Sequence, residues 1–263
     1  MKLDSYFNKI YVINLLDAET RMKKMEKRMK RLGIKYQRFV AIDGRTKNLS
    51  NASIIEKAKS MEIIYDVKIL GRDTSQIKTD LPSCSLTIGT VMLLRHMVRH
   101  KIKRILICED DIEFVKNFES KFKQGIKELE KTLKKNWDII YLGCGKECGI
   151  EGISVGKTRQ NRYSSQLNKY YHEDLYVKHK NDLRNPCDDC KKISEHMSIP
   201  VSPTGGWCYG YSLKGAKKML KLIDGDVNEH IDILLSDNIE NKKLRAVAFD
   251  PPIVMHEYGA ERP

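Results

Sequence analysis

Three consecutive carboxylates, Glu109, Asp110 and Asp111, follow an apolar run at residues 104–108 that is typical of a buried strand. Because side chains alternate along a strand, Glu109 and Asp111 are expected on one side and Asp110 on the other. Two carboxylates at the end of a strand suit a hard divalent cation such as Mn²⁺ or Mg²⁺. Such a cation bridges phosphate oxygens and neutralises a departing diphosphate. The alternative interpretation is an acidic turn that leads into the next helix.

A second motif with metal-binding chemistry is Cys187-Asp188-Asp189-Cys190. A structural zinc site needs four ligands, and a Cys-x-x-Cys pair supplies two of them. The other two would come from nearby cysteines or histidines, namely Cys144, Cys148, His172, His179 or His196. Free thiols are the alternative interpretation of the same motif.

Length and composition describe an ordinary globular protein. The chain has 263 residues, of which 41% are hydrophobic and 32% charged, enough to bury the core of a large α/β domain. The first thirty residues lack a signal-peptide pattern, and no apolar stretch is long enough to span a bilayer. Seven cysteines without a signal sequence indicate a reducing compartment and mostly free thiols. We therefore expect a cytoplasmic protein.

The formal net charge of +13 fits an anionic substrate, an anionic membrane surface or a nucleic acid. The basic residues are spread through amphipathic segments such as residues 22–31 and form no long tract. This distribution is typical of the wet face of a helix. We expect an anionic substrate, compatible with peripheral association with an anionic membrane, and no nucleic-acid partner. A basic nucleic-acid-binding protein remains a rival hypothesis.

The start of the chain must position whatever lies at the first strand's end. Residues 10–15 form a predicted strand, and Asp17 is the expected cap of a helix in which methionines recur at helical spacing until Gly33. Residues 36–42 form a second strand, closed by the turn pair at residues 43–44. A strand–helix–strand start predicts a parallel pair joined by a crossover.

Further elements alternate along the rest of the chain. We predict helices at residues 48–65, 83–100, 118–133, 215–223 and 231–235, strands at 104–108, 137–142, 206–213 and 245–249, and a loop at 71–78. His96 and His100 are expected to face solvent. Residues 146–198 are polar and weakly periodic, so we interpret them as an insertion beside the active site. The alternation predicts one α/β domain over residues 1–263, with a mostly parallel twisted sheet and helices on both faces.

Five blocks of sequence then occur in a familiar order. They are YVINL at 11–15 with Arg21 and FVAIDG at 39–44, residues 84–97, LICEDDIEF at 106–114, WDIIYLG at 137–143, and GGWCYGY at 205–211 followed by residues 215–218. This order resembles glycosyltransferase family 25, which includes bacterial lipooligosaccharide glycosyltransferases and collagen hydroxylysine galactosyltransferases. The resemblance covers nearly the whole chain, and residues 146–198 match poorly.

The resemblance implies a fold, a donor and a reaction. The fold would be the type-A glycosyltransferase fold, in which a nucleotide-binding half and an acceptor half share one sheet. The donor would be a UDP-sugar, and transfer would invert the anomeric carbon. The implied function is metal-dependent transfer of a hexose, galactose or glucose, to a hydroxyl on a lipooligosaccharide glycan or a collagen-like hydroxylysine.

The resemblance also assigns roles to the acidic triplet. Glu109 and Asp111 would hold Mn²⁺ or Mg²⁺, with His256 as a C-terminal ligand, and Asp110 would contact the ribose or donor sugar. Ligands of open α/β sheets bind beyond the carboxyl ends of the strands, which agrees with this assignment. A lone histidine without a special role is the alternative for His256.

Other positions would complete the donor and acceptor sites. The expected nucleotide-binding residues are Asn14, Leu15, Arg21, Ala41, Asp43, Gly44, Gly205 and Gly206, and the glycines would let the backbone approach the donor sugar. An inverting displacement needs a base for the acceptor hydroxyl, and Asp232 is the expected base. The alternatives are a surface arginine for Arg21 and a helix-capping aspartate for Asp232.

One position departs from the family's pattern. Family members carry a Ser-His pair a few residues after the cysteine that opens the third helix, and this chain has Thr87-Ile88 there. The hydroxyl is kept and the imidazole is lost. A different sugar or acceptor would explain the change, and so would a catalytically impaired nucleotide-binding protein of the same fold.

Overall fold

The computed structural model describes most of the chain, namely residues 2–44, 81–134, 136–144, 190–203, 205–223 and 229–256. The predicted helix at 48–65, the loop at 71–78, Cys187 and most of the proposed insertion lie outside these residues. The single-domain boundaries therefore stay a prediction.

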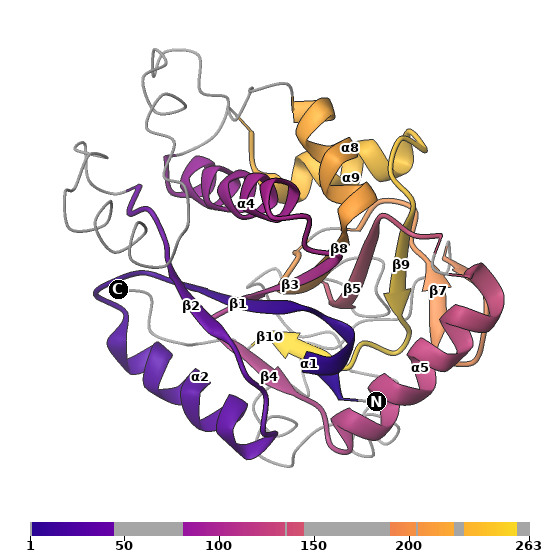
Figure 1. Ribbon diagram of the computed structural model, residues 1–263, viewed down its shortest axis with the longest axis horizontal. Coiled ribbons are helices and arrows are strands. Elements are labelled where there is room, and N and C mark those ends of the chain that lie inside the picture. Colours follow the sequence, from indigo (N-terminus) through magenta and orange to yellow (C-terminus); the bar gives the residue numbers. More distant parts are fainter. Residues whose placement is uncertain are drawn as a thin grey trace, which may run out of the picture.

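An eight-stranded sheet forms the centre of the molecule, in the order β2-β1-β3-β8-β5-β9-β7-β6 (Figure 1). Its strands are β1 (Lys9–Asn14), β2 (Gln37–Val40), β3 (Arg104–Glu109), β5 (Ile139–Gly143), β6 (Lys191–Lys192), β7 (Met197–Ile199), β8 (Cys208–Ser212) and β9 (Ala246–Phe249). Strand β1 pairs in parallel with β2 and β3, and β5 pairs in parallel with β9. Strands β8 and β7 run antiparallel to their neighbours. The mostly parallel sheet is thus confirmed, with β8 and β7 reversed.

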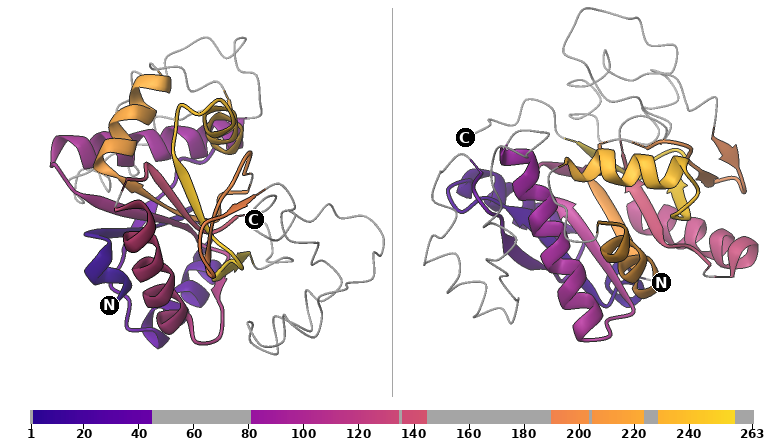
Figure 2. Two further views of the ribbon diagram at one scale, coloured as in Figure 1. Left: turned by 90° about the vertical axis from the view of Figure 1, so that its right-hand side faces the viewer. Right: turned by 90° about the horizontal axis from the view of Figure 1, so that it is seen from above.

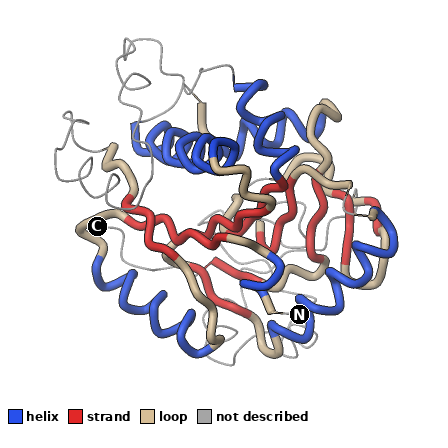
Figure 3. The backbone as a smooth tube through the Cα atoms, in the orientation of Figure 1, coloured by secondary structure: helices blue, strands red, loops and turns tan. Residues whose placement is uncertain are grey.

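Helices cover both faces of this sheet, as the alternating pattern predicts (Figures 2 and 3). One layer holds α1 (Leu3–Tyr6), α2 (Glu19–Arg31) and α5 (Phe118–Leu133), and the other holds α4 (Leu81–Arg99), α8 (Leu213–Ile223) and α9 (Ile231–Glu240). None of the described helices is long and apolar enough to cross a membrane.

Each helical layer has its own core. In α2 the methionines at 22, 25 and 29 lie on one buried face, and α5 buries Phe118, Phe122, Ile126 and Leu129 against the same side of the sheet. Burying one such side chain contributes about 1.5–3 kcal/mol. On the other side, α4 packs with α8 and α9 around a second cluster of buried residues. These two cores fix the sheet between the layers.

A small second sheet, which the sequence did not predict, lies beside the large one. Its antiparallel strands are β4 (Ile112–Phe114) and β10 (Val254–His256), and His256 pairs with Ile112. Strands of three residues show too little alternation to be recognised. Because β4 starts directly after the acidic triplet, this pairing brings the end of the described chain to the triplet.

Some boundaries differ from the prediction. Strands β6 and β7 belong to the main sheet, so the last residues of the predicted insertion are ordered as part of that sheet. Helix α9 continues to Glu240 instead of ending at residue 235. The cap of α2 is Ala18 instead of Asp17, because a turn that joins the amide of Ala18 to the carbonyl of Leu15 precedes the helix.

Two predictions about side chains were wrong. His96 is buried and its ring lies against Tyr11, because it lies one helical turn after the buried Met92 and Leu93. His100 is exposed, as expected. Three of the described cysteines carry free thiols, which agrees with the expectation of mostly free thiols. Cys144 and Cys190 are disulfide-bonded, so the interpretation of Cys190 as a zinc ligand or a free thiol was wrong.

Candidate metal and nucleotide site

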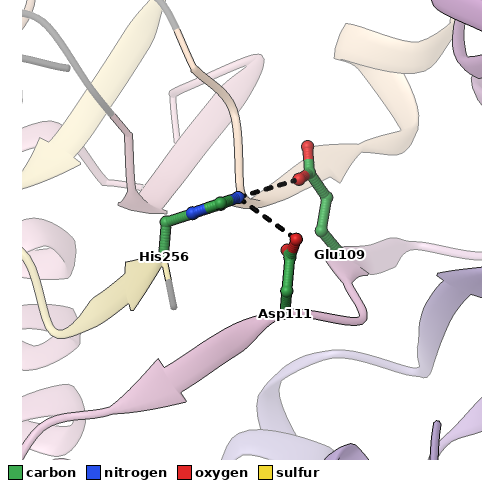
Figure 4. A group of neighbouring side chains, drawn as sticks. All are labelled: Glu109, Asp111 and His256. Carbon is green, nitrogen blue, oxygen red and sulfur yellow. Dashed lines mark ion pairs between the residues drawn. The ribbon is translucent and has the colours of Figure 1, made fainter. Parts of the chain in front are cut away.

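Glu109, Asp111 and His256 converge at the carboxyl end of β3 (Figure 4). Nε2 of His256 lies 3.3 Å from Oδ2 of Asp111 and 4.0 Å from Oε2 of Glu109. One ligand atom from each residue lies within 4.8 Å of the others. The three side chains are 11% to 27% exposed. Two carboxylates and an imidazole at this spacing have the chemistry of a divalent-cation site.

The electrostatics of this group favour a cation. Burial raises the pKa of Glu109 well above its ordinary value, and the charges of Asp111, Asp232 and Asp110 raise it further. Burial also acts to raise the pKa of Asp111, but the hydrogen bond and charge of His256, together with the charge of Arg21, lower it overall. Oδ1 of Asp111 is buried, and no described residue donates a hydrogen bond to it. A divalent cation would satisfy this oxygen and relieve the carboxylate repulsion.

Asp110 points away from this group, toward β1. The side-chain amide of Asn14 donates a hydrogen bond to its Oδ2, and Nη1 of Arg21 lies 3.3 Å from its Oδ1. The same Nη1 is 3.3 Å from Oδ2 of Asp111. Arg21 therefore joins the two aspartates, and Asp110 ties the end of β3 to the end of β1.

The remaining nucleotide candidates lie where β1 and β2 end. The side-chain amide of Asn14 also donates to the carbonyl of Ala18, and the Asn14 carbonyl accepts from the amide of Ala41. The carbonyl of Leu15 accepts from Arg38, which sequence reasoning did not single out. Asp43 and Gly44 lie two and three residues after Ala41 in the chain, so these candidates lie at the same sheet edge as the triplet.

Asp232 lies in the first turn of α9, next to the glycine pair. Its Oδ2 and Oδ1 accept hydrogen bonds from the amides of Gly205 and Gly206, each at 3.2 Å. The helix cap is His230, whose Nδ1 accepts from the amide of Asp232 at 3.1 Å. The capping interpretation of Asp232 is therefore wrong. Its carboxylate binds the loop that contains Gly205, Gly206 and Trp207, here called the glycine loop.

The glycine loop connects Asp232 to Glu109 and His256, two of the metal-ligand candidates. The amide of Glu109 donates to the carbonyl of Trp207 at 2.9 Å. The ring centroids of Trp207 and His256 lie 5.5 Å apart. Because β8 is reversed, its first residue meets the last residues of β3. The structure thus gathers all of the nominated residues around one edge of the sheet.

Sequence reasoning missed one contributor to this region, His230. His230 caps α9, and the only signal was an imidazole two residues before Asp232. Strand β8 holds Tyr209, whose ring atoms would lie 3.0 Å and 3.1 Å from a Cβ added at Gly206. A larger residue than glycine would therefore push Gly206 away from Tyr209 and Asp232.

Comparison with known proteins gives a consistent family. Residues 7–235 match the family model described as glycosyltransferase family 25 (LPS biosynthesis protein). A glycosyltransferase 25 family member of Drosophila melanogaster is 28% identical over 136 residues, which are 52% of this chain and 21% of that protein. The inactive glycosyltransferase 25 family member 3 of Homo sapiens is 25% identical over 152 residues, 56% of this chain and 24% of that protein. The matches thus span about a quarter or less of these relatives.

Solved structures are similar only at a distance. The inositol-1-phosphate CTP transferase of T. maritima gives a TM-score of 0.37 at 10% identity, covering 95% of this chain and 87% of that one. Mouse xyloside xylosyltransferase 1 gives 0.35 at 12% identity, covering 90% and 83%. TM-scores this low support no conclusion about function. The family model covers most of the residues that build the site, and on that ground the chain belongs to glycosyltransferase family 25.

Proposed function

We propose that the protein transfers a hexose from a UDP-sugar to an acceptor hydroxyl, with Mn²⁺ held by Glu109, Asp111 and His256. The observation that carries this proposal is the convergence of these side chains within 4.8 Å of one another, together with the buried Oδ1 of Asp111, to which no described residue donates a hydrogen bond. When bound, the ion would neutralise the charge of the departing diphosphate. Carboxylates suit Mg²⁺ and Mn²⁺, whereas an imidazole suits later transition metals, so the mixed ligand set favours Mn²⁺.

The donor would lie along the ends of β1 and β2. Arg21 offers a guanidinium beside the carboxylates, where a diphosphate would receive charge-assisted hydrogen bonds. The uracil and ribose would contact the nearby loop residues, namely Asn14, Leu15, Ala41, Asp43 and Gly44. Asp110 is buried and bonded to Asn14, so its role is to hold this loop in place as well as to face the ribose or sugar.

Asp232 is the proposed general base. Its carboxylate takes the proton of the acceptor hydroxyl while the hydroxyl oxygen attacks the anomeric carbon. The bond from that carbon to the diphosphate oxygen breaks, UDP leaves with the electron pair, and the anomeric configuration inverts. Gly205 and Gly206 hold the carboxylate by their amides, and the charge of Asp232 acts on Glu109. Both observations support a base that acts beside the metal ligands.

The hexose would be galactose or glucose, and the acceptor a lipooligosaccharide glycan or a collagen-like hydroxylysine. The net charge of +13 suits an anionic donor and peripheral association with an anionic membrane. A cytoplasmic location belongs to the same proposal.

An impaired nucleotide-binding protein is the second candidate, since three of the relatives are named inactive or probable inactive family members. Position 88 speaks against it in this chain. Ile88 is 5% exposed and packs in the core beneath α4. The side chain at this position is therefore part of the hydrophobic core and does not face the metal candidates.

A donor screen tests the proposed function. Release of UDP from a panel of UDP-hexoses is measured with Mn²⁺ and with a chelator. We expect hydrolysis of at least one donor, dependent on Mn²⁺ and slowed about 10²-fold or more by Asp232→Asn when an acceptor is present. The Asp232→Asn variant should still bind UDP. UDP binding without turnover of any donor would favour the impaired protein, and absence of both would reject the proposed function.

A further inference from the structure

The hydroxyl of Thr87 makes an unusual connection within the buried part of α4. Its Oγ1 lies 2.7 Å from the carbonyl oxygen of Glu229 and 3.3 Å from that of Ser83. A threonine inside a helix normally donates to the carbonyl four residues earlier. Here the shorter bond goes to Glu229, which is 142 residues away in the sequence. Since a hydroxyl has one proton, the contact with Glu229 is the main bond.

Glu229 begins the segment that leads into α9. Its carboxylate Oε1 accepts from the amide of His230 at 2.9 Å, and Nδ1 of His230 accepts from the amide of Asp232. An Nδ1 that accepts carries no proton, so a neutral His230 bears its proton on Nε2. Thr87 therefore anchors the segment from which the helix cap and the proposed base follow.

The chain of hydrogen bonds continues to the metal ligands. Asp232 accepts from the amides of Gly205 and Gly206, and the carbonyl of Trp207 accepts from the amide of Glu109. The path runs from α4 in one helical layer, through α9 and the glycine loop, to the end of β3. Every link joins a described donor to a described acceptor.

We propose that Thr87 and His230 are positioning residues that hold the Asp232 carboxylate at a fixed place relative to Glu109. This inference rests on the proposed function, because Asp232 must act as a base for its position to matter to turnover. The Thr87 hydroxyl is useful in this role because it holds the backbone of Glu229, whereas the neighbouring Ile88 side chain only packs in the core. The hydroxyl acts through the backbone of Glu229 and makes no contact with substrate.

Thr87→Val tests this role, because valine keeps the shape of threonine and removes the donor. A small displacement of a catalytic group caused by a change away from the chemistry can cost about 10²-fold in rate. We expect kcat for transfer from the UDP-hexose found in the donor screen to fall about 10- to 100-fold, while KM for that donor changes less than about threefold. Thr87→Ser keeps the donor and should restore most of kcat.

Two further variants separate positioning from stability. Ser212→Ala removes a hydroxyl that donates to the carbonyl of Trp137 at 2.9 Å, at the opposite end of the sheet, and should leave kcat unchanged at a temperature where the protein is folded. His230→Ala should repeat the effect of Thr87→Val. His230→Asn should spare kcat, because asparagine offers a cap oxygen.

A structural readout keeps the test independent of turnover. The amide signals of Gly205 and Gly206 in a proton–nitrogen correlation spectrum report their bonds to Asp232. We expect these signals to move in Asp232→Asn and Thr87→Val and to stay in Ser212→Ala. Unchanged glycine signals in Thr87→Val, or an equal loss of kcat in Ser212→Ala, would overturn the inference. If wild-type protein turns over no UDP-hexose, the proposed function fails, and the glycine signals still decide whether Thr87 positions Asp232.

Discussion

Arg21 occupies the position where a cation and a diphosphate would both act. Its Nη1 bridges Asp110 and Asp111 at 3.3 Å each, and its Nε is buried without a hydrogen-bond acceptor among the described residues. A divalent cation at Asp111 would weaken the hold of this carboxylate on the guanidinium. Arg21 would then turn its donors toward phosphate oxygens. The positive charge of Arg21 should therefore oppose binding of the metal ion at Asp111 and favour binding of the nucleotide.

Arg21→Gln tests these opposite effects. We expect Mn²⁺ alone to bind as tightly as in the wild type or up to a few-fold more tightly, because a competing charge is gone, and UDP with Mn²⁺ to bind about tenfold more weakly. Isothermal titration calorimetry measures both. Lys27→Gln, on the exposed side of the same helix, is the matched control for net charge. Unchanged UDP affinity in Arg21→Gln would show that the arginine is structural only.

At the residue scale, local pattern was enough to nominate the acidic triplet and the family resemblance added His256, but neither identified the residues that support them. The triplet follows a recognisable strand, so its alternation could be inferred from the sequence. The roles of His230 and Thr87 depend on contacts with residues far away in the chain or on the geometry of a helix start. Such contacts produce no regular residue spacing that could be recognised in a single sequence.

Strand β10 is the element that carries His256 to the site, and its packing against β5 is unusually close. A Cβ added at Gly143 would lie 2.1 Å from the carbonyl oxygen of Val254. Because the clashing atom belongs to the backbone, it cannot rotate away. Glycine at the end of β5 therefore sets the distance between β5 and the strand that bears the third ligand.

Gly143→Ala should displace β10 and with it His256. We expect the free energy of unfolding, measured with urea, to fall by about 1–3 kcal/mol or more, and the Mn²⁺-dependent rise in Tm to shrink. Gly89→Ala is the comparison, since its Cβ would meet only the Phe39 ring, at 3.2 Å. A Gly143→Ala protein with wild-type stability and metal response would contradict this account of β10.

Hydrogen bonds between Glu128 and His196 join α5 to the β6–β7 hairpin. Oε2 of Glu128 accepts from the His196 amide at 3.0 Å, and Oε1 lies 2.8 Å from its Nδ1. With Glu195 they form a second group of metal-type side chains, but both oxygens of Glu128 are engaged by His196. Burial acts to raise the pKa of Glu128, and the nearby Ser194 hydroxyl together with the hydrogen bonds from His196 outweigh it and lower the pKa.

The lowered pKa of Glu128 predicts a pH-dependent contribution to stability. A carboxylate whose pKa is lower in the folded state stabilises the fold above its ordinary pKa, and this stabilisation is lost as pH falls through the folded-state pKa. Glu128→Gln should therefore lower the free energy of unfolding by about 1 kcal/mol near pH 7 and by much less near pH 3. Urea denaturation at both pH values measures the difference. An equal loss at both would exclude the charge as the cause.

At the element scale, long periodic segments were predictable and short ones were not. Helix α5 begins and ends where the repeat of phenylalanine and leucine does, and β3 was clear from its apolar run. Strands β4, β6, β7 and β10 have two or three residues each. They exist because of tertiary pairing, which no local propensity reports.

The whole molecule explains why one edge of the sheet collects the site. The strands β1, β2 and β3 are parallel, so their carboxyl ends lie together, and the reversed β8 starts at the same edge. Helices cover both faces of the sheet (Figure 1). The strand ends are therefore the place where the polar site residues meet. The α/β class and the two layers were predictable from alternation, whereas the reversal of β8 and β7 was not, because strand direction depends on connections.

Titration of UDP into the protein, with and without Mn²⁺, tests the central claim most directly. The site of Glu109, Asp111 and His256 predicts that Mn²⁺ tightens UDP binding by about tenfold or more in the wild type, and that Asp111→Asn removes this gain. Binding of UDP that is indifferent to Mn²⁺, or equally dependent on Mn²⁺ in Asp111→Asn, would contradict the assignment of these three side chains to a metal–diphosphate site.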